Sequence, residues 1–272
     1  MAAPGAEAAP VHVIGDIHGQ YERFVSLLHD AGLIDSDLRW SGANSTLWLI
    51  GDLVDRGPDG NAVIALAMRL QRQAAAAGGA VNTLIGNHDI LLLAAWHFGD
   101  WPGKRRTESF EAIWQRNGGK LEDLARLERA QVDWLSDLPA MAHCGPYLLT
   151  HGDTMLYTRY GKSVAEVNAT FHDLLHGVDP VAWYRLLSEF SEHRVFTGAT
   201  GPARARQFLQ HFGGERILHG HTPISRITGE PAEQVTEPLI YADGLAIDVD
   251  GGMYLGGPGF VYRLPAELPG TS

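Results

Sequence analysis

Five short apolar runs in this chain each end in polar residues that stand beside a glycine. The runs are VHVIG, LWLIG, NTLIG, YLLT and RIL, and the residues that follow them are DIHG, DLVDRG, NHD, HGD and HGH. Runs of this length that are rich in β-branched and apolar residues predict buried strands. Helical periodicity over residues 20–33 and 59–79 separates the first three runs, so an α/β fold is expected.

The polar residues after these runs are expected to meet at one site. In an α/β sheet, ligands bind beyond the carboxyl ends of the strands, where side chains from several strands converge. One Asp-Gly pair after a strand is ordinary turn chemistry, and a lone histidine is more often structural than a ligand. Five repeats of the pattern favour a metal site. Asp52 is then a ligand on a rigid strand, and Asp55 and Arg56 lie one turn further on for catalysis and substrate binding.

The overall charge and the cysteine content exclude several classes of function. The formal net charge is −11, which argues against a nucleic-acid polymer or an anionic membrane as a partner. Cys144 is the single cysteine, so an intrachain disulfide is excluded and the chain suits a reducing compartment. The first ten residues lack the basic start and apolar run of a signal peptide, which predicts a cytoplasmic protein.

One main domain is expected over residues 11–264, with a flexible N-terminus at 1–10 and a tail at 265–272. Residues 90–141 have a mostly helical pattern between strands, which predicts an insertion that shapes substrate choice. Strands are expected to resume at YLLTHG. The segments LAIDVD, GMYLGG and GFVYRL near the C-terminus predict an antiparallel meander.

The motifs GDIHG, GDLVDRG and GNHD, in this order and spacing, resemble a known family. They are similar to the GDxHG, GDxVDRG and GNHE motifs of the phosphoprotein phosphatase branch of the calcineurin-like metallophosphoesterases. LLTHGD and LHGHTP follow where that family places two further histidine ligands, and the resemblance extends over about residues 11–262. It implies a central β-sandwich flanked by helices, in four layers ordered α/β/β/α.

The resemblance also implies a binuclear metal centre. The metal ligands that it implies are Asp16, His18, Asp52, Asn87, His151 and His221. Asp16 and His18 would bind the first metal, and Asp52 would bridge both. A hydroxide between the metals would attack the phosphorus directly, so neither Cys144 nor a serine is expected as a nucleophile.

Catalytic roles follow from the same resemblance. His88 would be the general acid, oriented by Asp55, and Arg56 would hold the phosphate. Arg194, in the segment upstream of the last histidine motif, is the candidate for a second phosphate-binding arginine. The residues expected to contact the phosphate are Arg56, Arg194, Asn87 and His88.

The proposed ligand set mixes nitrogen and oxygen donors. Three imidazoles, two carboxylates and one amide suit manganese, iron or zinc better than calcium or magnesium, which prefer oxygen ligands. Manganese is the metal expected here. Two such metals can stabilise the attacking and the leaving oxygen of an in-line displacement, and an arginine fork matches phosphate oxygens.

Four features depart from the family pattern or stay open. Asp89 stands where the family usually has glutamate, and its shorter reach puts the support of the neighbouring ligands in question. Asp153 adds a carboxylate near the metals. His219 lies two residues before His221 and is expected to support the ligands rather than to bind metal. The role of the 90–141 insertion is also open.

The expected substrates are phosphomonoesters, with phosphoserine and phosphothreonine in proteins as the leading class. The alternative is a symmetrical bis(nucleosyl)-tetraphosphatase or another small-molecule phosphoesterase. The cationic segment Trp101–Arg106 could contact an anionic substrate of either class at the cleft rim, although a solvated loop is the commoner role of such a segment. A non-catalytic binding module is disfavoured because every expected ligand is present. The oligomeric state is not predicted.

Overall fold

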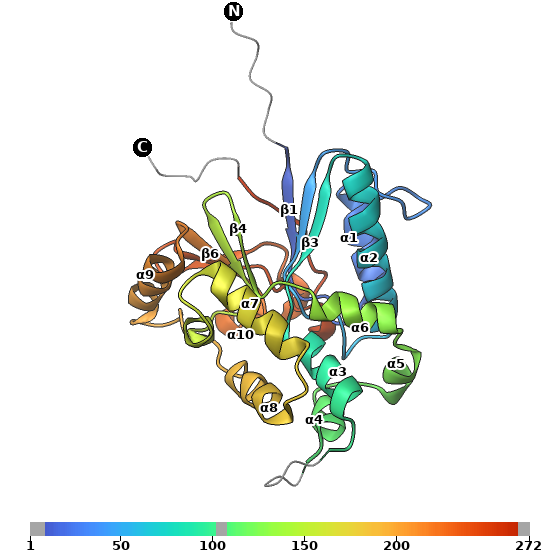
Figure 1. Cartoon of the computed structure of the whole chain (residues 1–272). Helices are drawn as coiled ribbons and strands as arrows, with labels where there is room; N and C mark the ends of the chain where they lie inside the picture. The colour runs from blue at the N-terminus through green and yellow to red at the C-terminus, as the bar shows by residue number, and fades with distance from the viewer. Residues whose placement is uncertain (1–8, 102–107, 266–272) are drawn as a thin grey trace, which may run out of the picture.

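Two β-sheets lie face to face at the centre of the computed structural model, which describes residues 9–101 and 108–265 (Figure 1). The first sheet has four strands in the order β3-β2-β1-β9. Strands β1, β2 and β3 are parallel, with Val11 opposite Thr46 at the start of the register, and β9 is antiparallel to β1. These strands are β1 (Val11–Ile14), β2 (Thr46–Leu49), β3 (Ala80–Thr83) and β9 (Tyr262–Arg263).

The second sheet has five strands in the order β4-β5-β6-β8-β7. Strands β5, β6 and β8 are parallel, and the two edge strands are antiparallel to their neighbours. The parallel strands of both sheets direct their carboxyl ends toward one region of the molecule. The strands of this sheet are β4 (Met141–Cys144), β5 (Tyr147–Thr150), β6 (Arg216–His219), β7 (Leu239–Tyr241) and β8 (Ala246–Asp248).

Alternate residues of the strands fill two different parts of the core. Val13 of β1 and Trp48 of β2 pack with Leu149 of β5 and Leu218 of β6 in a cluster between the sheets. Their neighbours in the chain, such as Ile14, point to the helices instead. This alternation follows from the two-residue repeat of a strand, and it requires both faces of each sheet to be covered.

Helices cover the outer faces of both sheets. Helix α2 (Gly60–Ala76) packs on β3 and contacts α1 (Tyr21–Asp30), whereas α7 (Val164–Leu175) contacts β4 and α9 (Gly201–Phe212) contacts β6 (Figure 1). The expected four-layer α/β/β/α sandwich is therefore confirmed. Helices α2 and α7 begin at side-chain caps that the sequence supplies. For example, the Asp59 carboxylate accepts the amide of Ala62 at 3.0 Å at the start of α2.

In the described part of the segment between β3 and β4 there are four helices, and α3 begins directly after the third predicted strand. They are α3 (Asn87–Phe98), α4 (Phe110–Arg116), α5 (Leu121–Arg126) and α6 (Arg129–Ser136). The remaining helices are η1 (Leu156–Arg159), α8 (Pro180–Glu189), α10 (Ile224–Thr228), η2 (Ala232–Gln234) and η3 (Met253–Leu255). None of the described helices is long and apolar enough to cross a membrane.

The predicted C-terminal meander is wrong. The segment GMYLGG forms the 3-10 helix η3, because Gly252 and Gly256 adopt left-handed conformations on either side of it. Strand β8 joins the second sheet and β9 joins the first, so they are not neighbours. Strand β4 was also not foreseen. Three other predictions fall largely outside the described residues. These are the flexible N-terminus (residues 1–8 are not described), the cationic segment (102–107) and the C-terminal tail (266–272).

Candidate active site

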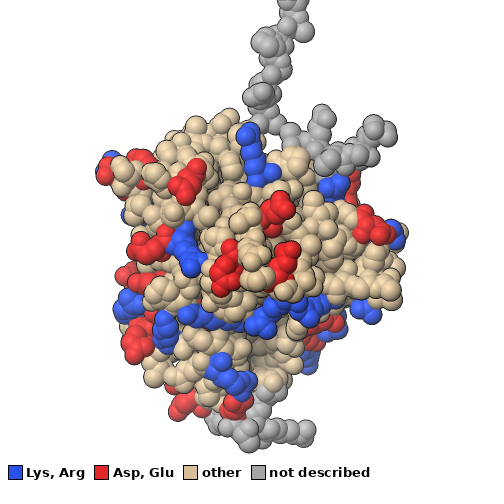
Figure 2. All heavy atoms as spheres, turned by 180° about the vertical axis from the view of Figure 1, so that it is seen from behind, with Lys and Arg blue, Asp and Glu red and all other residues tan. Residues whose placement is uncertain are grey.

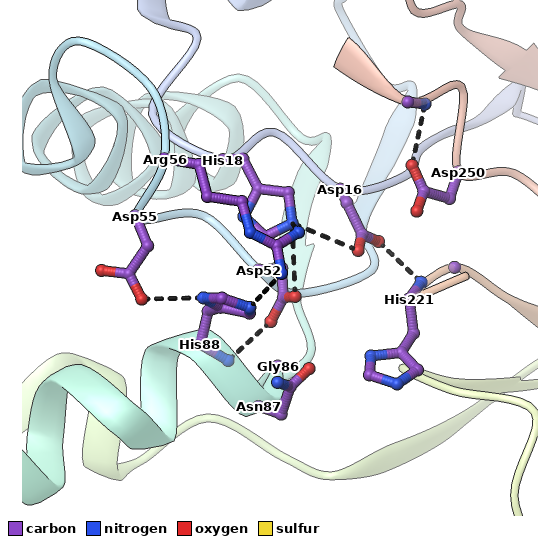
Figure 3. A network of polar contacts seen from close by, with 12 residues as sticks. Asp16, His18, Asp52, Asp55, Arg56, Gly86, Asn87, His88, His221 and Asp250 are labelled. Carbon is purple, nitrogen blue, oxygen red and sulfur yellow. Dashed lines mark hydrogen bonds and ion pairs between the residues drawn. The ribbon is translucent and has the colours of Figure 1, made fainter. Parts of the chain in front are cut away.

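Residues that follow five strands meet where the two sheets converge, and Figure 3 labels those that follow β1, β2, β3 and β6. Asp16 follows β1 and Asp52 follows β2, whereas His88 lies in the first turn of α3, just beyond β3. His151 and His221 follow β5 and β6 of the other sheet. Asp16, Asp52, His88 and His151 are buried. The structure thus brings together polar groups that are up to 205 residues apart in the chain.

The backbone at these strand ends adopts a conformation that is uncommon outside glycine. His18, Asp52 and His221 have φ values of 47°, 49° and 72°. Asp55 and Arg56 follow, both with φ of 67°. A left-handed residue that is not glycine costs about 1–2 kcal/mol, and such strain concentrates at functional sites. The residues singled out from the sequence are therefore held in unusual conformations by the surrounding fold.

Two glycines allow the backbone to approach the carboxylates closely. A Cβ atom on Gly220 would lie 2.3 Å from Oδ1 of Asp16, and one on Gly86 would lie 2.2 Å from Oδ1 of Asp52. Neither position has room for a side chain. The amide of His221 uses this approach to donate to Oδ1 of Asp16 at 3.0 Å, and the amide of His88 donates to Oδ1 of Asp52 at 2.8 Å.

The side chains form two groups of potential metal ligands that share Asp52. His18, Asp52 and His88 lie in one group, and Asp52, His151 and His221 lie in the other, each with ligand atoms within 4.8 Å of one another. Nε2 of His18 is 3.6 Å from one Asp52 oxygen, and Nε2 of His151 is 3.3 Å from the other. A carboxylate with one oxygen toward each group suits a bridging role.

Asn87 and Asp16 complete the two groups. Oδ1 of Asn87 lies 3.0 Å from Nε2 of His151, and Oδ2 of Asp16 lies 3.9 Å from Nε2 of His18. Oδ2 of Asp16 and Nδ1 of His221 are buried and have no hydrogen-bond partner in the described structure. Because buried polar atoms are nearly always paired, these two atoms fit the ligands of a cation.

The imidazoles of His18 and His151 are oriented by hydrogen bonds at Nδ1, while their Nε2 atoms face Asp52. Nδ1 of His18 lies 3.0 Å from the carbonyl oxygen of Val54, and Nδ1 of His151 lies 2.8 Å from that of Ile50. A carbonyl only accepts, so each Nδ1 carries the proton and each Nε2 keeps a lone pair. This is how proteins commonly orient metal-binding histidines.

Burial favours the neutral, metal-binding form of the histidines. Burial and the neighbouring His151 lower the pKa of His221 to about 3. Burial also lowers the pKa of His18 and of His151. Burial by itself would raise the pKa of Asp52, but the four surrounding histidines outweigh it and hold that pKa below its ordinary value. Neutral imidazoles around an ionised carboxylate are the form that binds a metal.

A second carboxylate lies next to Asp16. Burial and the neighbouring Asp250 raise the pKa of Asp16 well above its ordinary value, and burial raises the pKa of Asp250 to about 7 (Figure 3). Two buried carboxyl groups so close together disfavour ionisation of both. A divalent cation at Asp16 would relieve that cost, so the charges of the site also fit a bound metal.

The His88 ring lies between the carboxylate of Asp55 and the guanidinium of Arg56. Its Nδ1 is 2.8 Å from Oδ2 of Asp55, and its Nε2 is 2.8 Å from a guanidinium nitrogen of Arg56 (Figure 3). The same guanidinium contacts Nε2 of His18 at 3.0 Å and lies 4.1 Å from the ring centroid of Tyr254. The predicted general acid, its orienting carboxylate and the phosphate-binding arginine are therefore neighbours.

A cleft of about 550 Å³ opens above these residues. Asp52, Asn87, His88 and His221 line its base. Its walls include Ile113 and Arg116 of α4, Tyr184 and Leu187 of α8, and Arg226 of α10. The helices between β3 and β4 therefore supply part of the cleft wall.

Arg194 lies at the rim, apart from the residues that line the cleft. Its side chain is exposed and donates to the carbonyl of Arg226, which does line the cleft. Its amide donates to Oδ1 of Asp153 at 2.9 Å. Of the two predicted phosphate-binding arginines, Arg56 faces the cleft base and Arg194 does not in this conformation.

The roles of Asp89, Asp153 and His219 were left open by the sequence, and in the structure each forms hydrogen bonds. Oδ2 of Asp153 accepts from the hydroxyl of Tyr241 at 3.3 Å, and Nε2 of His219 is 2.7 Å from the same hydroxyl. His219 belongs to neither ligand group. Asp89 accepts the amides of Leu53 and Gly86, both at 2.9 Å, so its shorter side chain does reach the turn that carries Asp52.

Three site residues were missed in the sequence. Asp250 follows β8 and precedes a glycine pair, so the strand-end pattern that selected the other five ends could have found it. Trp114 donates its indole N–H to Oδ1 of Asp55 at 2.7 Å, and Tyr254 packs on Arg56. Both come from helices without a recognisable motif, and only their tertiary position reveals them.

The sequence model of the calcineurin-like phosphoesterase family matches residues 9–225. The fold and the site define a metallophosphoesterase, a hydrolase of phosphoesters. The chain belongs to the calcineurin-like phosphoesterase family, whose members use a binuclear divalent metal centre.

Similar proteins include more than one kind of phosphatase. An uncharacterized protein of Schizosaccharomyces pombe is 38% identical over 245 residues, which cover 80% of this chain and 70% of that protein. A symmetrical bis(5'-nucleosyl)-tetraphosphatase of Neisseria meningitidis is 26% identical over 72% of this chain. Shewanella-like protein phosphatase 2 of Arabidopsis thaliana is 36% identical over 41% of it. The matches span 66% of the Neisseria protein and 28% of the Arabidopsis protein.

A solved structure supports the fold. The cold-active protein-tyrosine phosphatase of a psychrophilic Shewanella species superposes with a TM-score of 0.72, at 24% sequence identity. The superposition covers 95% of this chain and 76% of that one. At this identity the likeness shows a common architecture.

Proposed function

We propose that this protein is a binuclear metal-dependent phosphatase that hydrolyses phosphomonoesters, with phosphoserine and phosphothreonine in proteins as its main substrate class. The observation that carries the proposal is the position of Asp52, whose two oxygens face two separate groups of histidines. A shared carboxylate of this kind is the central ligand that a two-metal phosphoesterase needs.

Each group of side chains would hold one cation. Asp16, His18 and Asp52 would bind the first, and Asp52 with Asn87 and two histidines, His151 and His221, would bind the second. Manganese is the metal we expect, because the donors are mixed nitrogen and oxygen. When bound, the two cations supply positive charge for the phosphoryl oxygens and lower the pKa of a water that serves as the nucleophile.

Arg56 would bind and orient the phosphate group of the substrate. Its guanidinium lies between His18 and His88 at the base of the cleft, held by the ring of Tyr254. An arginine fork can donate two parallel hydrogen bonds to phosphate oxygens, which fixes the group in line for displacement. Arg194 would contact the substrate only after its side chain leaves the carbonyl of Arg226.

His88 would donate a proton to the leaving oxygen. Asp55 accepts the Nδ1 proton, so Nε2 is the atom that would exchange the catalytic proton. In this structure Nε2 accepts from the Arg56 guanidinium, and it would be free to carry a proton once that guanidinium binds the phosphate. Positioned general acids typically contribute about 10²–10⁴-fold to a rate. Serine and threonine alkoxides are poor leaving groups, and they need this proton more than an aryl oxide does.

The charges of the cleft also favour anionic substrates. The chain has a net charge of −11, yet Lys and Arg side chains form a row across the face opposite to that of Figure 1 (Figure 2). Arg56, Arg116 and Arg226 line the cleft itself. Arg116 is partly offset by its ion pair with Glu108. A second candidate substrate is therefore a dinucleoside polyphosphate, whose phosphate chain could contact Arg226 while a base contacts Tyr184.

A side-by-side assay of the manganese-loaded enzyme tests the proposal. One reaction follows phosphate release from a phosphothreonine peptide, and the other follows ADP release from diadenosine tetraphosphate. We expect a higher kcat/KM for the peptide. Faster ADP release would overturn the protein substrate and support the dinucleotide. Asp52→Asn is the matched control and should abolish both activities and reduce the metal content, whereas an active Asp52→Asn enzyme would overturn the metal centre.

A further inference from the structure

A second cluster of metal-binding side chains lies on the surface, away from the catalytic cleft. It consists of Asp137, which caps the C-terminus of α6, and of His172 and His176 at the end of α7. One ligand atom from each residue lies within 4.8 Å of the others. None of the three lines the cleft. We propose that this cluster binds a divalent transition-metal ion, such as zinc, at a site separate from the catalytic centre.

The helix places the two imidazoles on one face. Residues four apart in a helix are neighbours on its surface, and the amide of His176 donates to the carbonyl of His172 at 3.0 Å, so the helical spacing holds at this end. The two rings are 4.3 Å apart, centroid to centroid. Two histidines at this spacing can chelate one ion without a change in the backbone.

A single carboxylate oxygen supplies the third ligand. Oδ1 of Asp137 is 2.9 Å from Nε2 of His176 and 3.7 Å from Nε2 of His172. In a tetrahedral zinc site with bonds of about 2.1 Å, ligand atoms are roughly 3.4 Å apart. The observed separations bracket that value. The shorter contact is a hydrogen bond that Nε2 of His176 donates, so the ion would displace that proton, and small rotations of the side chains would complete the site.

The neighbouring residue Asp173 supports this geometry. Nδ1 of His172 is 3.6 Å from Oδ1 of Asp173, on the side of the ring away from Asp137. At this distance the contact is longer than a hydrogen bond. A small rotation of the exposed Asp173 side chain would let it accept the Nδ1 proton and leave the Nε2 lone pair for the ion, as a carboxylate behind a metal-binding imidazole commonly does. Two imidazoles and one oxygen favour zinc, copper or nickel over calcium or magnesium.

The ion would join two distant parts of the chain. Asp137 belongs to the segment that connects β3 of the first sheet to β4 of the second. The two histidines lie at the end of α7, which packs against β4. A bond between them closes the stretch from 137 to 176, which contains the β4-β5 hairpin. Metal binding would therefore reduce the opening of the ends of α6 and α7.

Zinc content and local protection test this site. The variant His172→Gln with His176→Gln removes both imidazoles, and all three cluster residues are at least 42% exposed, so the fold should persist without zinc. His29→Gln with His211→Gln is the matched control, because both of these histidines are exposed and lie outside the cluster. Each protein is equilibrated with buffered free zinc, and its bound zinc is counted by mass spectrometry.

We expect the wild type and the control to hold one more zinc per chain than the cluster variant. Asp137→Asn should lower the zinc affinity of the site about tenfold or more. Hydrogen exchange provides a second measurement. Zinc should slow exchange at residues 134–138 and 172–177 in the wild type and the control, but not in the cluster variant. Equal zinc counts, or zinc-dependent protection that is equal in all three proteins, would overturn the proposal.

Discussion

The carboxylate of Asp55 joins His88 to Trp114: one oxygen lies 2.8 Å from Nδ1 of His88, and the other accepts the indole N–H of Trp114 at 2.7 Å. Trp114 belongs to α4, in the chain segment that connects β3 of the first sheet to β4 of the second. This segment therefore contacts the proposed proton donor through one intermediate residue, in addition to forming a wall of the cleft.

Replacement of Trp114 by phenylalanine should slow the enzyme without unfolding it. The phenyl ring keeps most of the packing at this buried site, but Asp55 loses a hydrogen bond worth about 1 kcal/mol, so its hold on His88 loosens. We expect kcat on a phosphothreonine peptide to fall by about five- to tenfold with little change in KM. Steady-state kinetics measures this. An unchanged kcat would show that the indole N–H has no part in positioning Asp55.

His88→Asn should separate proton donation from metal binding. The metal content should stay at the wild-type value, and kcat should fall by about 10²–10⁴-fold on phosphothreonine. The loss should be much smaller on p-nitrophenyl phosphate, because its leaving group needs no proton. Metal analysis and the two assays test this together. A full rate on the alkyl ester would contradict the role of His88 as general acid.

Tyr254→Leu should weaken phosphate binding. The ring of Tyr254 lies 4.1 Å below the guanidinium carbon of Arg56, and a cation–π contact of this kind contributes about 0.5–1 kcal/mol. We expect KM for phosphate esters to rise about two- to fivefold, with kcat less affected. Tyr254→Phe is the control, since it keeps the ring and should keep the wild-type KM. Similar values for the leucine and phenylalanine variants would argue against the contact.

Asp250→Asn should change how the metal-free protein responds to pH. Burial raises the pKa of Asp250 to about 7, against about 3.9 in an unfolded chain. The folded state therefore binds more protons between these values, and the contribution of Asp250 to stability is lost as the pH rises through about 7.

Urea unfolding in the presence of EDTA measures this effect. Between pH 5 and pH 7, the free energy of unfolding of the wild type should fall by about 2 kcal/mol relative to that of Asp250→Asn. Above about pH 8 the difference should level off. Asn keeps the side-chain oxygen that accepts the amide of Gly252, so the comparison isolates the charge. Parallel pH profiles would show that Asp250 titrates near its ordinary value.

The strand-end pattern was sufficient to predict an α/β fold and to select residues that the fold brings together, whereas the sandwich was implied by the family resemblance. Asp16, Asp52, His88, His151 and His221 all come to one point, because parallel strands end at the same edge of a sheet. The information is local: a short apolar run, a glycine and a polar residue appear together in the sequence. Asp250 followed the same rule after β8 and could have been found with it.

Other features depended on contacts between distant segments, and no local pattern could predict them. The pairing of β9 with β1 and of β8 with β6 and β7 decided which sheet each C-terminal strand joined. Tertiary packing also brought Trp114 to Asp55 and Tyr254 to Arg56, and it left Arg194 at the rim. It likewise placed Asp137 beside His172 and His176.

The sequence by itself determined the class of fold and the side chains that meet at the strand ends, because strand periodicity and turn chemistry act over a few residues. The tertiary structure decided which residues support those side chains, which walls form the cleft and which surface groups meet. Those outcomes depend on how whole helices and sheets pack, since packing brings together residues that the chain keeps far apart.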